Sequence, residues 1–149
     1  MRSTCESLRG DGRRIVFTNG CFDLLHPGHI RLLSEAASRG DALVVAINDD
    51  ASVRRLKGND RPIYPAEERA ELLLALRWVD YVTVFPEDTP LETIHEVRPD
   101  VLVKGDEYEE GNIVGASFVR DSGGAVVRVR MKRGHSTRRI VRRISEADG

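Results

Sequence analysis

The sequence predicts an α/β fold, a doubly wound parallel sheet of five strands with helices on both faces. Short apolar runs alternate along the chain with segments whose apolar residues recur at helical spacing, which is typical of repeated β–α units. The runs are nearly continuous in apolar residues, as in strands that helices cover on both faces. In such a Rossmann-like arrangement, ligands bind beyond the carboxyl ends of the strands.

Five apolar runs are the expected strands. The first of them, Ile15 to Phe17, is followed by Asn19 and Gly20, which we expect to break the strand. The second is an apolar run without a break. The expected strands are 15–17, 42–47, 81–85, 101–103 and 125–129.

The segments between these runs are expected to be helices. Pro27 and Pro65 suit a first helical turn, because the N–H that proline lacks would have no helical partner there. Ser136 is a typical N-cap, whereas Gly40 and Gly123 end helices. The expected helices are 27–39, 51–56, 65–76, 89–98, 113–121 and 137–143.

The length of 149 residues is that of one domain with a substantial core. Residues 1–12 are expected to be a flexible N-terminal tail, because the segment is polar and Gly10 and Gly12 loosen the entry to the first strand. Residues 13–145 form the domain in this interpretation, and residues 146–149 form a C-terminal tail.

Composition excludes several classes of protein. No run is long enough to cross a bilayer, and the first residues lack the apolar core of a signal peptide, so no membrane partner is expected. Cys5 and Cys21 are too few for a disulfide framework, which favours a cytoplasmic location. The net charge of −1 does not indicate nucleic acid as a partner.

The segment 128–143 is strongly basic and contains no acidic residue. It is either a solvated helix and strand end or a phosphate-gathering edge, and we favour the second reading only beside Ser136 and Thr137. Its eight basic residues are Arg128, Arg130, Lys132, Arg133, Arg138, Arg139, Arg142 and Arg143.

Residues 14–29 read as a strand, a tight loop and a helix start. A helix start offers free backbone N–H groups and positive dipole charge, which suit a phosphate. His26 and His29 are three residues apart and can share one face of the first turn, while Gly28 lets the backbone approach a ligand. The stretch therefore predicts a nucleoside triphosphate site, and a triphosphate should raise the pKa of both imidazoles.

The histidine pair has two other interpretations. The stretch can be an ordinary βα turn with two surface histidines, or the pair can ligate a metal ion. The second reading lacks a third ligand at matching spacing nearby.

Further candidates have alternatives of their own. Ser136-Thr137-Arg138 is either a second phosphate cradle or a plain N-cap. Lys57 lies in what we expect to be a mobile loop, where it either closes over the phosphates or is simply solvated. Arg69 either pairs with glutamates of its own helix or contacts phosphate.

The ten residues Gly20 to His29 resemble the Gly-x-Phe-Asp-x-x-His-x-Gly-His motif of the cytidylyltransferase-like nucleotidyltransferases. Several further strings resemble the D-glycero-D-manno-heptose 1-phosphate adenylyltransferase branch of that family. They are Asn19-Gly20, 51–58, 61–63, 87–91, 98–105 and 113–116.

The resemblance implies transfer of AMP from ATP to a heptose 1-phosphate, with release of pyrophosphate. It implies Mg²⁺ carried by the triphosphate without direct protein ligands, a separate heptose kinase, and a family that is often dimeric. His135, Arg138 and the string Lys-Gly-Asp-Glu-Tyr at 104–108 depart from the family pattern. They leave open a cytidylyltransferase that acts on glycerol 3-phosphate or another polyol or sugar phosphate, or a non-catalytic nucleotide-binding module.

The expected site residues divide among three roles. Catalytic roles fall to His26, His29, Lys57 and Arg69. Nucleotide binding falls to Asn19, Gly20, Cys21, Phe22, His26, Gly28, His29, Gly105, Asp106, Ser136, Thr137 and Arg138. Contacts with the sugar phosphate fall to Asp23, Asn48, Lys57 and Lys104, although Asp23 is also expected to fix its loop through hydrogen bonds.

Overall fold

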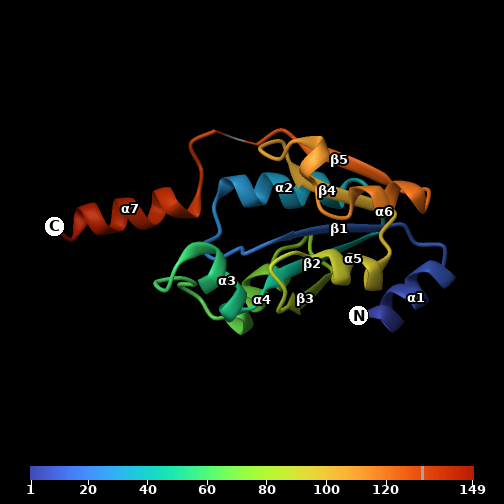
Figure 1. Ribbon diagram of the computed structural model, residues 1–149, viewed down its shortest axis with the longest axis horizontal. Coiled ribbons are helices and arrows are strands. Elements are labelled where there is room, and N and C mark those ends of the chain that lie inside the picture. Colours follow the sequence, from blue (N-terminus) through green and yellow to red (C-terminus); the bar gives the residue numbers. More distant parts are fainter. Residues whose placement is uncertain (132) are drawn as a thin grey trace.

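The computed structural model describes residues 1–131 and 133–149, and within them one parallel sheet of five strands has the order β3-β2-β1-β4-β5 (Figure 1). This confirms the expected fold class. The strands are β1 (Ile15–Gly20), β2 (Ala42–Asn48), β3 (Tyr81–Phe85), β4 (Val101–Gly105) and β5 (Ala125–Val129). β1 is longer than expected, because Asn19 and Gly20 still pair with Ala46 and Ile47 of β2.

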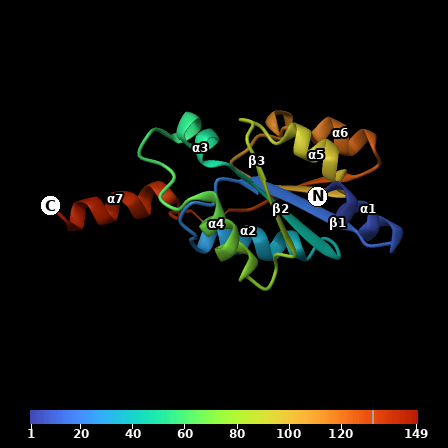
Figure 2. The same ribbon diagram turned by 90° about the horizontal axis from the view of Figure 1, so that it is seen from below.

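Helices cover both faces of the sheet (Figure 2). α1, α5 and α6 contribute to the core on one face, and α2 and α4 to the core on the other. The helices are α1 (Arg2–Gly10), α2 (Pro27–Ala37), α3 (Asp50–Lys57), α4 (Ala66–Leu74), α5 (Leu91–Val97), α6 (Ala116–Asp121) and α7 (Thr137–Ala147). A short 3₁₀ turn, η1, occupies Glu110–Asn112.

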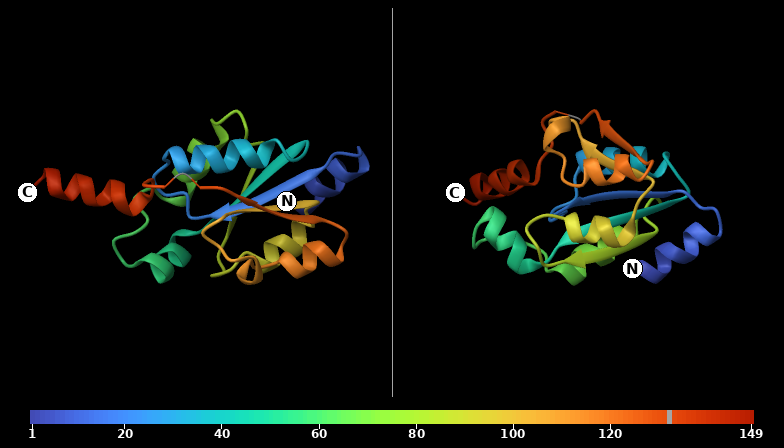
Figure 3. Two further views of the ribbon diagram at one scale, coloured as in Figure 1. Left: turned by 90° about the horizontal axis from the view of Figure 1, so that it is seen from above. Right: turned by 45° about the vertical axis from the view of Figure 1, so that its right-hand side comes forward.

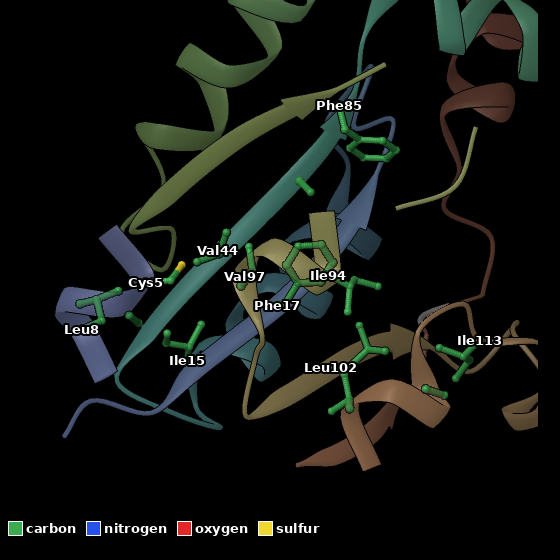
Figure 4. Packing of buried hydrophobic residues seen from close by; sticks show 14 residues of the cluster. Cys5, Leu8, Ile15, Phe17, Val44, Phe85, Ile94, Val97, Leu102 and Ile113 are labelled. Carbon is green, nitrogen blue, oxygen red and sulfur yellow. The ribbon is translucent and has the colours of Figure 1, made fainter. Parts of the chain in front are cut away.

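The two cores follow from the alternation of side chains along each strand. In β1, Ile15 and Phe17 face the first core, which Figure 4 shows, and Val16 faces the second. β2 alternates in the same way, and each of its residues is buried. A strand buried on both faces must be apolar throughout, which explains the unbroken run in the sequence.

The topology places a switch point beside β1. The chain passes from β1 outward to β2 and β3, then returns to the other side of β1 for β4 and β5. The loops that follow β1 and β4 therefore diverge in opposite directions at the carboxyl end of the sheet. Such a divergence leaves a crevice in doubly wound folds, and the ligand binds there.

The expectation of a flexible tail at residues 1–12 was wrong. Residues Arg2–Gly10 form α1, whose Cys5 and Leu8 are buried in the first core (Figure 4). Arg9 Nη1 also donates to the Val97 carbonyl at 2.8 Å. Cys5 and Leu8 are three residues apart and form a narrow apolar stripe on the helix. The mostly polar composition of the segment hid this stripe in the sequence.

Two other boundaries differ from the sequence reading. α6 begins only at Ala116, because Gly115 adopts a left-handed conformation with φ of 83°. α7 runs to Ala147, past the expected end at Arg143 and into the expected C-terminal tail. It extends away from the sheet, and none of its residues is buried (Figure 3).

We expect Leu8→Ala to lower the free energy of unfolding by about 2–4 kcal/mol, because the truncation leaves a cavity beneath α1. Urea denaturation measures this change. Ser7→Ala, at an exposed position of the same helix, serves as the control and should change it by less than about 0.5 kcal/mol. Equal stability of both variants would show that α1 does not hold its place on the core.

Candidate active site

The crevice at the carboxyl ends of the strands holds a cavity of about 680 Å³. Most of the residues expected from the sequence to bind substrates line it together. They are Asn19, Gly20, Cys21, Phe22, Asp23, His26, His29, Asn48, Lys57, Lys104, Gly105, Ser136, Thr137 and Arg138. Asp106 lines a second cavity of about 690 Å³ instead, and Glu107 and Met131 border both.

His26 and His29 lie at the N-terminal end of α2, and hydrogen bonds from backbone N–H groups fix the orientation of both rings. His26 is the N-cap, and its Nδ1 accepts a hydrogen bond from the Gly28 N–H at 3.1 Å. His29 Nδ1 accepts from the His26 N–H at 3.3 Å. Because Nδ1 is an acceptor in both neutral rings, the proton lies on Nε2 in both. The sequence thus builds a reciprocal cap that leaves two N–H donors available to a ligand.

The two imidazoles are neutral at physiological pH. Burial, together with a smaller effect of the adjacent His26, lowers the pKa of His29 to about 3. Burial also lowers the pKa of His26, with a smaller effect from the charge of His135. The rings stack with centroids 3.7 Å apart, so two positive charges would repel strongly. The predicted rise in the pKa of both histidines applies to the site with a triphosphate bound. In the ligand-free protein both pKa values are lowered instead.

This depressed pKa predicts how stability depends on pH. Below pH 6.5 the unfolded chain protonates His29, whereas the folded protein keeps it neutral to about pH 3. The unfolded state therefore binds more protons, and the free energy of unfolding should fall as the pH drops from 6.5 to 4.5, by up to about 1.4 kcal/mol per pH unit for each such imidazole. Urea titrations across this range measure the slope, and His29→Asn should flatten it. A slope that is absent, or equal in the variant, would contradict the neutral imidazole.

Asp23 fixes the loop, as expected. Its carboxylate accepts hydrogen bonds from Arg61 Nε at 2.7 Å and from the backbone N–H groups of Ile63 and Tyr64. Burial would raise the pKa of Asp23, but the N–H groups of Tyr64 and Ile63 and the Arg61 guanidinium hold it below its ordinary value. Because the side chain is 1% exposed, the structure does not support the contact with a sugar phosphate that the resemblance implies.

Lys104 is a buried ammonium at the end of β4. Its Nζ donates to the backbone carbonyl and to Oδ1 of Asn19, each at 3.2 Å, and lies 4.4 Å from the centre of the Tyr108 ring. Burial lowers the pKa of Lys104 to about 8, an effect that Glu107 opposes. Lys104 thus joins the ends of β1 and β4 at the switch point and adds positive charge to the cavity.

Lys57 lies in the last turn of α3, and the expectation of a loop position was wrong. The Asp49 side chain accepts from the Ser52 N–H at 2.7 Å, and this cap starts the helix. Gly58, with φ of 111°, ends it. Lys57 is exposed and borders the cavity, so a rigid helix holds it at the rim.

The start of α7 borders the cavity next to the N-terminal end of α2. Ser136 Oγ accepts from the Arg139 N–H at 3.1 Å, as in a plain N-cap. Thr137 Oγ1 donates to the Leu24 carbonyl at 3.1 Å and ties α7 to the loop after β1. Arg138 borders the cavity and is exposed. Lys132, part of the basic segment, lies outside the residues that the structure describes.

Arg69 lies beneath the cavity, and neither sequence reading of it was right. Its side chain is 0% exposed. It donates to the carbonyls of Cys21, Asn48 and Tyr64 and pairs with Asp50 at 2.8 Å. A guanidinium enclosed in this way contacts no phosphate, and its partner is not a glutamate of α4.

Several residues of the site were missed. Arg61, His135 and Tyr108 border the cavity but were not assigned a contact. All three lie in segments that follow strands, and the rule that ligands bind beyond the carboxyl ends could have included them. Among residues 1–131 and 133–149, no group of three or more His, Cys, Asp or Glu side chains is arranged to hold a metal ion. No helix within these ranges is long and apolar enough to span a bilayer.

Comparison with known proteins points in one direction. The profile of a family described as "Cytidylyltransferase-like" matches residues 17–138. The chain is 54% identical over 142 residues to bifunctional protein HldE of Gluconobacter oxydans, which covers 95% of this chain and 30% of that protein. It is 50% identical over 144 residues to bifunctional protein HldE of Syntrophotalea carbinolica, covering 97% and 29%. The chain thus spans about 30% of the length of these curated relatives.

Two solved structures are also similar. The lipopolysaccharide core biosynthesis protein from Thermoplasma volcanium is 32% identical with a TM-score of 0.66, over 81% of this chain and 98% of that one. Pantoate–β-alanine ligase from Francisella tularensis is 18% identical with a TM-score of 0.61, over 89% and 66% of the chains. The second likeness concerns the fold alone.

Proposed function

This chain belongs to the cytidylyltransferase-like family, and from that premise we propose that it transfers AMP from ATP to D-glycero-D-manno-heptose 1-phosphate. The observation that supports nucleotidyl transfer most is the pair of neutral imidazoles at the N-terminal end of α2, whose Nδ1 atoms accept backbone hydrogen bonds so that each ring carries its proton on Nε2. The sugar and the base are proposed from the sequence strings that resemble the heptose 1-phosphate branch.

The reaction needs positioning and charge stabilisation more than a nucleophile of the protein. An oxygen of the sugar phosphate attacks the α-phosphorus, and the bond from that phosphorus to the bridging oxygen breaks, so that pyrophosphate leaves. Negative charge grows on the phosphate oxygens as this happens. His26 and His29 donate to those oxygens, and the dipole of α2 adds positive potential at its N-terminal end.

The acceptor is proposed to lie on the side of β2 and α3. Lys57 is the cation at that rim, and Asn48 lies at the end of β2 with its Nδ2 held by Ser52 Oγ at 2.9 Å. Lys104 lines the cavity on the other side of β1, and its charge is proposed to act on both substrates. The two substrates would thus meet above the end of β1.

Mg²⁺ is proposed to enter with the triphosphate, because it keeps several waters and uses few protein ligands. When bound, it neutralises charge on the β- and γ-phosphates. A cytoplasmic location is a further proposal that rests on the small number of cysteines. A homodimer and a separate heptose kinase are proposals that rest on the resemblance.

The sequence left two alternatives open. A cytidylyltransferase for a polyol phosphate is one of them, because His135 and Arg138 depart from the family pattern and border the cavity. The other is a non-catalytic nucleotide-binding module, which would bind nucleotide at the N-terminal end of α2 without turning it over.

One assay separates the three. Pyrophosphate release is measured with ATP, CTP, GTP and UTP, each crossed with heptose 1-phosphate, glucose 1-phosphate and glycerol 3-phosphate under Mg²⁺. The highest kcat/KM should belong to ATP with heptose 1-phosphate. A maximum at CTP with glycerol 3-phosphate would select the cytidylyltransferase. Nucleotide binding by calorimetry without release in any combination would select the binding module.

We expect Lys57→Ala to lower kcat/KM about 30-fold, which corresponds to about 2 kcal/mol, because one exposed cation at the rim is lost. Steady-state kinetics measure the change. Arg54→Ala removes an exposed cation of the same helix that does not border the cavity, and its kcat/KM should stay within about twofold. Equal kcat/KM values for Lys57→Ala and the wild type would show that Lys57 is a solvated lysine with no part in the reaction.

A further inference from the structure

We propose that Arg69 is a positioning residue that locks the loop after β1 to the start of α3, so that the histidines and Lys57 face the same point. This inference rests on the proposed function, and it assigns Arg69 no contact with either substrate.

Four hydrogen bonds join Arg69 to four separate parts of the chain. Its Nη1 donates to the carbonyls of Cys21 and Asn48, each at 2.8 Å. Its Nε donates to the Tyr64 carbonyl at 2.9 Å, and its Nη2 to Asp50 Oδ1 at 2.8 Å. The acceptors belong to the loop after β1, the end of β2, the segment before α4 and the first residue of α3.

The side chain must be arginine because of its shape as well as its charge. A guanidinium is a rigid fork whose N–H groups point in several fixed directions in one plane, whereas an ammonium is a single point charge. Arg69 is 0% exposed, and its bond to the Asn48 carbonyl is buried, so a side chain that could not reach this carbonyl would leave it unpaired in the interior. Lysine can keep the charge near Asp50, but it cannot reach three carbonyls at once.

A second carboxylate extends the network to the loop that carries the histidines. Asp50 Oδ1 also accepts from the Ala66 N–H at 2.8 Å. Asp23 accepts from the N–H groups of Ile63 and Tyr64, and the carbonyl of Tyr64 is the one that Arg69 holds. The segment 63–66 is therefore clamped between Asp23 of the loop and Asp50 of α3, with Arg69 beneath it.

The consequence for the reaction concerns relative placement. Cys21 belongs to the loop that leads to His26, and Asp50 is the first residue of the helix that ends at Lys57. Because α3 is rigid, the position of Asp50 sets that of Lys57, about 10 Å further along the helix. Loss of the network should let Lys57 move relative to the two histidines. A displacement of about 1 Å can lower the rate about 100-fold.

The test compares Arg69→Lys with Arg120→Lys, which makes the same change at an exposed ion pair of α6. In the ligand-free protein, amide hydrogen exchange at Ile63, Tyr64 and Ala66 should be at least 10-fold faster in Arg69→Lys, with β1 and β2 unchanged. The kcat/KM for the sugar phosphate should fall at least 30-fold, while the Kd of Mg-ATP changes less than threefold. The control should move none of these quantities.

Other results would overturn the proposal. A Kd for Mg-ATP that rises in proportion to the loss of kcat/KM would indicate a direct phosphate contact. Unchanged exchange and unchanged kcat/KM would indicate simple packing. If Arg69→Lys does not fold, Asp50→Asn, which keeps the shape and removes the ion pair, should show the same pattern at about threefold, and its absence rejects the proposal. A wild type without turnover defeats the proposed function, whereas the exchange result still decides the role of Arg69.

Discussion

Replacing His29 with alanine should lower kcat about 1,000-fold, which corresponds to about 4 kcal/mol of transition-state stabilisation. The substitution removes the Nε2–H donor of His29. It also removes the Nδ1 acceptor for the His26 N–H, so the second imidazole loses part of the support that orients it. Steady-state kinetics with saturating substrates measure the loss, and the fold should persist because the ring lines the cavity and belongs to neither hydrophobic core.

The control for this variant is His95→Ala. His95 is an exposed histidine of α5, on the opposite side of the sheet from α2, and its ring packs against Phe118 with centroids 4.4 Å apart. Its removal should leave kcat within about twofold. If His29→Ala kept activity within a few-fold of the wild type, the donor role of the imidazole would be wrong.

Gly28→Ala is the second substitution with a large expected effect, a loss of about 100-fold in kcat/KM. A Cβ at residue 28 would lie 2.8 Å from Cε1 and 2.9 Å from Nδ1 of His26. The imidazole must therefore move, and with it both the cap on the Gly28 N–H and the donor at Nε2. A misplaced Nε2–H donor stabilises the transition state only weakly. The loss in kcat/KM therefore approaches the loss expected from removing His26.

Gly10→Ala is the matched control, because a Cβ at the end of α1 would meet nothing within 4 Å. Its kcat/KM should equal that of the wild type, and its stability should stay the same or rise slightly. A Gly28→Ala variant with full activity would show that the His26 ring has room to adapt and that its orientation does not limit the rate.

The strands and the histidine loop could be predicted because their signals are local. The unbroken apolar run of β2 and the proline at the start of α2 each occupy one short stretch, and the structure confirms both. α1 was missed because only Cys5 and Leu8 of its residues are buried, too few to outweigh a polar composition.

The role of Arg69 and the partners of Asp23 could not be predicted for a different reason. The partners of Arg69 include Cys21, which is 48 residues away in the sequence, and those of Asp23 include Ile63, which is 40 away. Which carbonyls meet a buried guanidinium depends on the packing of four segments, and no local pattern encodes it. The sequence marked both residues as important and indicated that Asp23 fixes its loop, but for Arg69 it could not tell a substrate contact from a support beneath the site.

The central claim is that the first turn of α2 holds a triphosphate through two neutral imidazoles. A crystal structure with Mg²⁺ and a non-hydrolysable ATP analogue tests it most directly. We expect oxygens of the α- and β-phosphates within hydrogen-bonding distance of Nε2 of His26 and His29, with Ser136 and Thr137 beside the outer phosphates. A nucleotide bound elsewhere, with both rings turned away from it, would contradict the account.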